Sequence, residues 1–95
     1  MAEFNRRRLR YSVLKEFDEG NQPTHGTFDI NQNDYRNFLA ELQYDGYMAG
    51  IIFTKTHIIF KKARLTPLGE QYVDENSGLA KTYKVAKELR DWIKL

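Results

Sequence analysis

An amphipathic helical pattern that runs directly into two short β-rich segments is the feature that most constrains the fold of this chain. Four apolar residues of the pattern recur at i, i+3, i+4 and i+7, the spacing of one buried helix face: Tyr35, Phe38, Leu39 and Leu42. Residues 47–53 and 58–61 follow, and both segments are rich in β-branched and aromatic side chains. The sequence therefore predicts a helix with one face in the core and, directly after it, a β-hairpin.

The residues at both ends of this helical pattern are typical of helix boundaries. Asn31 is a good N-cap, and Asp34 places a negative charge in the first turn, where the helix macrodipole favours one. Gly46 suits the left-handed conformation that commonly follows the end of a helix. We therefore expect the helix to end near residue 45, and the hairpin to turn at a polar tip over residues 54–57.

Other segments complete the order of elements. Residues 5–19 have apolar side chains at helical spacing, and residues 21–27 are interpreted as a turn or a poorly formed short helix. Thr66 is an N-cap followed by Pro67 at the first helical position, which predicts a short helix to about residue 75. A last helix is expected over about 78–94.

This order of elements predicts an α+β fold of the winged helix-turn-helix type. Such a fold combines helices with a β-hairpin wing of two to three strands, and here a C-terminal helix is added. A length of 95 residues is near the common size of one domain, so we expect a single domain over residues 1–95. An aromatic content of 14% supports a folded core.

Charge is segregated along the chain, although the net charge is only +2. Residues 1–15 carry five basic side chains and one acidic, whereas residues 16–50 carry one basic and seven acidic. Residues 51–66 carry four basic side chains and no acidic ones. Such segregation creates local potentials that the net charge hides, and it directs attention to the two basic segments as candidate contacts for an anionic partner.

Composition also limits the compartment and the chemistry. The chain contains no Cys, which excludes disulfides and thiolate metal sites. Its longest apolar run covers residues 48–53, whereas a helix needs roughly 20 apolar residues to span a bilayer. The basic N-terminal residues are not followed by an apolar stretch, as they would be in a secretory signal. We therefore expect a cytoplasmic protein without membrane contact.

Several segments resemble those of a known family. Residues 38–47 are similar to the end of a winged-helix recognition helix that runs into a wing strand, and residues 65–73 resemble the Leu-Thr-x-x-Gly-x-x-Tyr segment that follows the wing in bacterial regulators. Together with residues 9–16 and 83–94, they make the chain resemble the YjcQ-like family of small proteins from Gram-positive bacteria and their phages. The resemblance implies a winged-helix fold and no particular reaction. The chain departs from a strong helix-turn-helix at residues 21–27, where Pro23 and Gly26 interrupt the helix.

The predicted fold indicates candidate contacts to double-stranded DNA. In a helix-turn-helix protein, the N-terminal part of the recognition helix enters the major groove, where Asn and Gln pair with adenine and Arg pairs with guanine. The recognition helix and its surroundings offer the following polar and basic candidates: Gln32, Asn33, Arg36, Asn37, Gln43, Lys55, His57, Arg6, Arg7 and Arg8. The simpler interpretation is that these are polar side chains on solvated faces.

One property of the recognition helix favours a different role. Residues 32–45 carry Arg36 against Asp34, Glu41 and Asp45, so the helix is acidic, whereas Lys and Arg supply most non-specific affinity for DNA. The alternative hypothesis is therefore a non-catalytic protein–protein interaction module on a winged-helix scaffold. A transcriptional regulator associated with a phage or prophage remains the first hypothesis.

The predicted last helix carries a basic stripe opposite an apolar face. Packing of that apolar face on the domain is the simplest interpretation. A homodimer contact through the C-terminal helix and an accessory phosphate contact are two alternatives. Enzymatic activity is not expected. His25 and His57 are the only histidines, and the sequence contains neither a phosphate-binding loop nor the context of a nucleophile elbow. We expect no metal site and no cofactor.

Overall fold

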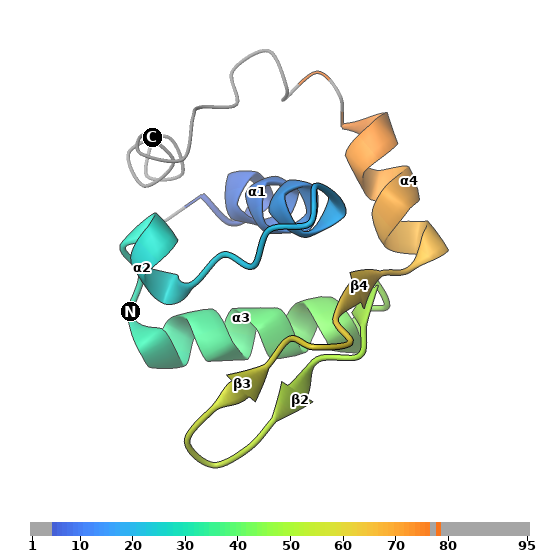
Figure 1. Ribbon diagram of the computed structural model, residues 1–95. Helices are drawn as coiled ribbons and strands as arrows, with labels where there is room; N and C mark the ends of the chain where they lie inside the picture. Colours follow the sequence, from blue (N-terminus) through green and yellow to red (C-terminus); the bar gives the residue numbers. More distant parts are fainter. Residues whose placement is uncertain (1–4, 77, 79–95) are drawn as a thin grey trace.

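The computed structural model describes residues 5–76 and residue 78 (Figure 1). In these residues, three helices are followed by a β arm (residues 48–65) and a further helix. The elements follow in this order: α1 (Arg6–Asp18), α2 (His25–Phe28), α3 (Gln32–Tyr44), β1 (Met48–Ala49), β2 (Ile52–Phe53), β3 (Ile58–Ile59), β4 (Arg64–Leu65) and α4 (Pro67–Glu75). The fold class is α+β, as predicted, and the arrangement is compatible with a winged helix. Within the described residues, no helix has the length and hydropathy that a membrane crossing requires.

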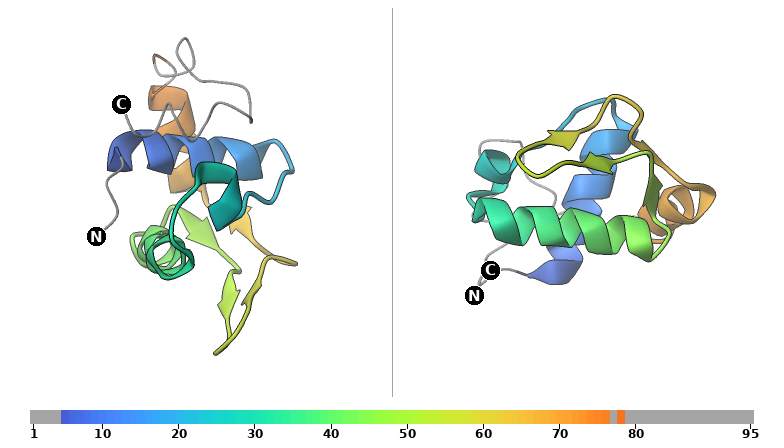
Figure 2. Two further views of the ribbon diagram at one scale, coloured as in Figure 1. Left: turned by 90° about the vertical axis from the view of Figure 1, so that its left-hand side faces the viewer. Right: turned by 90° about the horizontal axis from the view of Figure 1, so that it is seen from below.

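Capping residues define the ends of the two long helices, and the sequence predicts those of α3. The Asn5 side chain accepts a hydrogen bond from the Arg8 N–H at 3.0 Å, and it begins α1. The Asn31 side chain accepts from the Asn33 N–H at 2.8 Å at the start of α3, which ends before Gly46 with its φ of +89°. Figure 2 shows that α1 crosses α3. The predicted boundaries of both helices are confirmed.

The core lies where α1, α2 and α3 meet. The four apolar α3 residues singled out by their spacing are all buried, together with residues from α1, from the α2 segment, from the β arm and from α4: Leu9, Tyr11, Val13, Leu14, Phe28, Ile30, Tyr35, Phe38, Leu39, Leu42, Met48, Ile51 and Val73. The Tyr35 hydroxyl donates to the Pro23 carbonyl at 2.7 Å, which ties α3 to the turn before α2. Burial raises the pKa of Tyr35 well above that of a free tyrosine.

The segment before α3 contains the predicted short helix. α2 is only one turn long, and the Thr24 backbone N–H donates a hydrogen bond to the Thr27 hydroxyl oxygen at 3.1 Å. Asp29, with a φ of +54°, then reverses the chain direction. The interruption at residues 21–27 therefore shortens α2, but Phe28 is still fully buried, and its ring lies 5.9 Å from that of Tyr35. Helix–turn–helix connectivity is kept.

The β arm differs from the two continuous strands that the sequence predicts. It contains two separate two-stranded antiparallel sheets: β1 pairs with β4, and β2 pairs with β3. Gly50 separates β1 from β2 because its φ of +84° is incompatible with extended pairing. A Cβ at this position would lie 2.0 Å from the Lys62 carbonyl oxygen, so the two crossing segments touch through their backbones here. We call β2, β3 and the residues between them (52–59) the wing.

α4 returns the chain to α1 after the β arm. Thr66 caps it as predicted, accepting from the Gly69 N–H at 3.1 Å, and Pro67 follows at the first helical position. The Arg10 guanidinium of α1 lies over the rings of Tyr47 and Tyr72, 5.6 and 5.7 Å from their centroids, and so joins α1 to α4 and to the residue before β1. The predicted C-terminal helix over about 78–94, and with it the predicted dimer contact, lies outside the described residues apart from residue 78.

Candidate nucleic-acid interface

The N-terminal end of α3 and the tip of the wing lie on the same face of the molecule. Together they line a hollow of about 260 Å³, to which α3 contributes Gln32, Asn33 and Arg36, and to which the wing contributes residues 55–58. Five of the ten predicted contact residues thus line one site, because this set also includes Lys55 and His57. None of the described residues that line the hollow carries a carboxylate.

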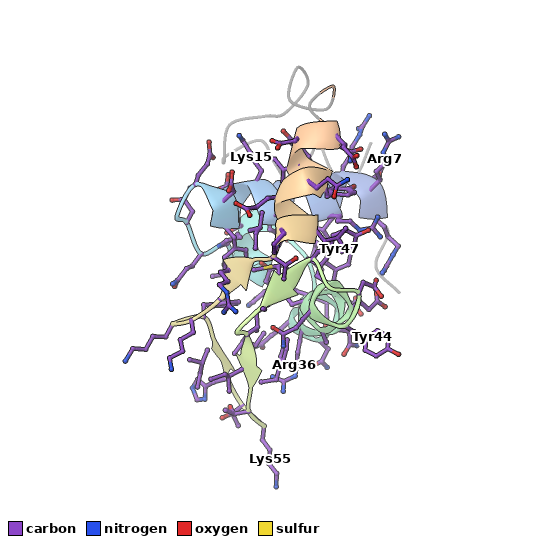
Figure 3. All side chains as sticks on the ribbon, turned by 90° about the vertical axis from the view of Figure 1, so that its right-hand side faces the viewer. Arg7, Lys15, Arg36, Tyr44, Tyr47 and Lys55 are labelled. Atoms are coloured by element: carbon purple, nitrogen blue, oxygen red, sulfur yellow. The ribbon has the colours of Figure 1, made fainter. Side chains whose placement is uncertain are left out.

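The outer face of α3 continues this site toward the C-terminal end of the helix. Asn33, Asn37, Ala40 and Tyr44 are all exposed, and their spacing of four, three and four residues places them in one row along the helix. Tyr44 has an exposed fraction of 92%, and Figure 3 shows it on the side of α3 away from the core. Sequence reasoning missed Tyr44. Tyr44 does not belong to the apolar pattern of Tyr35, Phe38, Leu39 and Leu42, and this could have indicated that its side chain is exposed.

Arg36 is directed at the wing. Its Nη1 donates to the His57 carbonyl at 3.3 Å, its Nη2 donates to the Thr54 carbonyl, and its guanidinium lies 5.3 Å from the centroid of the Phe53 ring. Figure 3 shows Arg36 between α3 and the wing. The predicted guanine-reading arginine therefore has both terminal nitrogens engaged with the backbone on either side of the wing tip.

Gln43 requires a correction to the predicted site. Its side-chain Nε2 donates to the Ile51 carbonyl at 3.0 Å, and its Oε1 accepts from the Ile51 N–H at 2.8 Å. The amide groups that we predicted for adenine recognition are thus used on the backbone just before β2. Gln43 lies on the side of α3 that faces the β arm because it is seven residues, or two helical turns, beyond Arg36.

The wing tip is a tight, internally hydrogen-bonded turn. The Thr54 N–H donates to the His57 carbonyl at 2.9 Å, and the His57 N–H donates to the Thr54 hydroxyl at 2.9 Å. The His57 Nδ1 lies 2.7 Å from the Thr56 hydroxyl oxygen. Lys55, which lies between Thr54 and Thr56, is exposed and extends from the tip away from the body of the domain (Figure 3).

A second, more apolar hollow lies beneath the wing. It measures about 170 Å³ and shares Gln32 and residues 56–58 with the first. The other residues that line it come from the start of α2, from α3 and from the β arm just after β3: Thr24, His25, Tyr35 and Phe60. Within the described part of the chain, no group of three or more His, Cys, Asp or Glu residues has a metal-binding arrangement. We therefore treat this hollow as an extension of the interface and assign it no ligand.

Comparison with known proteins places the chain in a family. The family model described as "YjcQ protein" matches residues 11–92, which is most of the chain. The chain belongs to the YjcQ family. It is 34% identical over 93 residues to a Bacillus subtilis (strain 168) protein named "Uncharacterized protein YjcQ", a match that covers 95% of this chain and 99% of that relative. No solved structure matches the chain.

The YjcQ match contains α3 and the wing but begins after the three N-terminal arginines, and the structure separates these arginines from the hollow. Arg6 forms an ion pair with Glu41 and lies 5.1 Å from the Phe38 ring centroid. The Arg7 Nη2 donates to the Asn76 side chain at 3.4 Å, and Figure 3 shows Arg7 at the opposite end of the molecule from Lys55. Arg8 is half-buried on α1. Arg6 and Arg7 therefore do not share the face of the wing, because Arg6 is directed toward α3 and Arg7 toward the end of α4.

Proposed function

We propose that this YjcQ-family chain is a non-catalytic module that binds double-stranded DNA in the cytoplasm and serves as a transcriptional regulator. The observation that carries the proposal is the shared hollow of α3 and the wing tip, in which five candidate contact residues converge. In a helix-turn-helix protein the recognition helix enters the major groove while neighbouring segments contact the phosphate backbone. The start of α3 and the tip of the wing are suitably placed for these two tasks.

The exposed row on α3 supports contact with base edges. Asn33 and Asn37 are exposed one turn apart, and an Asn side chain can pair bidentately with adenine in the major groove. Ala40 follows them in the row, and its small apolar side chain suits contact with a thymine methyl group. Of the predicted base-reading residues, we keep Gln32, Asn33 and Asn37, because the polar groups of Arg36 and Gln43 are engaged with the β arm.

Electrostatics supports phosphate contact through the β arm. Residues 51–66 carry four basic side chains without an acidic one, and the three beyond the wing are exposed: Lys61, Lys62 and Arg64. The ion pair with Arg6 partly neutralises Glu41, one of the three acidic residues of the α3 segment. The positive potential of the arm therefore compensates for the acidic helix beside it.

A salt titration of binding to random-sequence duplex DNA, followed by fluorescence anisotropy, tests this proposal. We expect micromolar binding at low salt, with log K falling by about 0.9 per unit of log salt concentration for each neutralised phosphate. Lys55→Ala should weaken binding and reduce that slope by about 0.9. Arg7→Ala removes the same charge at the opposite end of the molecule and is the matched control. Undetectable wild-type binding at low salt, or equal losses in the two variants, would contradict the proposal.

A protein-docking module is the second candidate, and an exposed apolar pair favours it. Ile52 and Ile59 lie directly opposite each other in the wing, with exposed fractions of 49% and 40%, while Phe53 and Ile58 face the core. If the duplex titration fails, a pull-down that compares the wild type with Ile52→Asp tests this role. Loss of a specifically retained protein in the variant would support it.

A further inference from the structure

The wing is poorly connected to the rest of the molecule through its own backbone pairing. Each of the two sheets has only two residues per strand, and Gly50–Ile51 on one side and residues 60–63 on the other separate the wing from the β1–β4 pair. Backbone hydrogen bonds between strands orient a continuous sheet, and this ladder is interrupted at both connections. The angle of the wing relative to α3 therefore depends on side-chain contacts, which include the packing of Phe53 and Ile58 against the core.

Two α3 side chains contact the β arm, one just before the wing and one at the wing tip. At the base, the Gln43 amide makes two hydrogen bonds with the backbone of Ile51, one as donor and one as acceptor. At the tip, the Arg36 guanidinium donates to the carbonyls of Thr54 and His57 and lies over the Phe53 ring. The two side chains are seven residues apart, so they project from the same side of the helix.

These contacts share a property that suits them to positioning. Their hydrogen bonds all go to backbone groups of the β arm, so they fix the path of the chain whatever side chains the arm displays. One attachment just before the wing and one at its tip constrain both the distance and the angle between the wing and α3. A single attachment would leave the wing free to rotate about that point. A charge-assisted hydrogen bond and a bidentate amide contact are also among the stronger and more directional polar contacts.

We propose that Arg36 and Gln43 are positioning residues that hold the wing at a set angle on α3, so that Lys55 lies on the same face as Asn33. This inference rests on the proposed DNA binding for its functional consequence. It replaces the expected role of Arg36 as a guanine reader, because the N–H groups of Nη1 and Nη2 that would form an end-on bidentate contact with guanine are directed at the wing carbonyls. Arg36 contributes to binding through the placement of Lys55.

A double-mutant cycle on duplex DNA separates positioning from direct contact. Arg36→Ala, Lys55→Ala and the double variant are titrated by anisotropy at several salt concentrations. If Arg36 acts through the wing, Lys55→Ala weakens binding by about fivefold in the wild type but by less than about twofold in the Arg36→Ala background, because coupled residues are not additive. If Arg36 contacts DNA itself, the two losses multiply, and the proposal is overturned.

Arg36→Lys distinguishes the shape of the side chain from its charge. Lysine keeps the positive charge, but it lacks the planar fork that bridges the Thr54 and His57 carbonyls. We expect Arg36→Lys to reproduce the coupling seen with Arg36→Ala. Recovery of wild-type affinity by lysine would show that only the charge at position 36 matters, which contradicts the positioning role.

A measurement without DNA keeps this inference separate from the proposed function. Residual dipolar couplings of backbone amides report the orientation of the wing relative to α3, and they are compared among the wild type, Arg36→Ala and Gln43→Met. We expect altered couplings over residues 52–59, with unchanged couplings in α1 and α3. Unchanged wing couplings in both variants would overturn the inference. If the wild type does not bind DNA but the variants show altered wing couplings, the positioning role is supported and only the DNA-binding proposal is contradicted.

Discussion

At the residue scale, Asn33, Arg36 and Gln43 lie on one helix but have different partners. Asn33 is exposed and lines the hollow, Arg36 donates to the wing tip, and Gln43 is hydrogen-bonded to the backbone of Ile51. All three are polar residues that fit the solvent side of the amphipathic pattern. Their different roles follow from the 100° rotation per residue of a helix, which turns Arg36 and Gln43 toward the arm.

Gly50 combines a left-handed backbone with a close approach to another segment. Gly50→Ala should destabilise the fold by about 2–4 kcal/mol, because a left-handed backbone costs an L-residue roughly 1–2 kcal/mol and the new Cβ also collides with the arm. That Cβ would lie 2.0 Å from the Lys62 carbonyl oxygen. The free energy of unfolding, measured by urea denaturation, checks the change.

Gly20 provides the matched control for this prediction. Its φ of +87° is close to the +84° of Gly50, but an added Cβ would meet nothing within 4 Å. Gly20→Ala should therefore cost only the conformational part, about 1–2 kcal/mol. Equal losses in the two variants would show that the contact with Lys62 contributes nothing.

At the element scale, α3 combines a structural face with a functional face. Its inner side provides four core residues, and its outer row presents Asn33, Asn37 and Tyr44. A third side holds the wing through two polar side chains. The helix is thus the element through which core packing, wing orientation and the candidate interface are joined. Weakening its packing should affect all three, whereas changes on its outer row should affect only the last.

Leu42→Ala tests the inner face of α3. Leu42 is only 2% exposed, and truncation of a buried leucine costs about 2–5 kcal/mol through lost burial and the cavity left behind. Tyr44→Ala, two residues later and 92% exposed, should change stability by less than about 0.5 kcal/mol. Thermal and urea unfolding of both variants check the contrast. A small shift for Leu42→Ala would refute the packing described here.

At the scale of the whole molecule, charge is divided between neighbouring segments. The α3 segment is acidic and the β arm basic, and Arg7 lies at the opposite end of the molecule from Lys55 (Figure 3). Arg6 crosses to α3 and pairs with Glu41, a residue 35 positions later in the chain. The net potential on the candidate interface therefore depends on pairs formed between distant segments, and removal of one acidic group should change it measurably.

Glu41→Gln should raise the affinity for random duplex DNA by roughly two- to fivefold at low salt, because it removes a negative charge from the α3 face and frees Arg6. Stability should change by no more than about 1 kcal/mol, since the ion pair is exposed. Asp74→Asn on α4 is the charge-matched control, because α4 extends away from the wing. Anisotropy at two salt concentrations provides the measurement. Equal gains in both variants would show that only net charge matters.

The sequence by itself determined the elements whose signals are local. The structure has the buried face predicted from the spacing of Tyr35, Phe38, Leu39 and Leu42. It also has the predicted caps at Asn31 and Thr66 and the short helix before α3. Hydrophobic periodicity and capping act within one or two turns of chain, so they can be read without knowledge of the fold. The five candidate residues that line the hollow were found in the same way.

Only the tertiary structure decided which polar groups remain available at the interface. Arg36 meets carbonyls 18 and 21 residues away, Arg6 meets a carboxylate 35 residues away, and the break at Gly50 depends on contact with Lys62. A polar residue on the solvent side of a helix has the same local pattern whether it faces water or another segment. Its partner is set by how the elements pack, because burial and hydrogen bonding depend on groups that are distant in sequence and close in space.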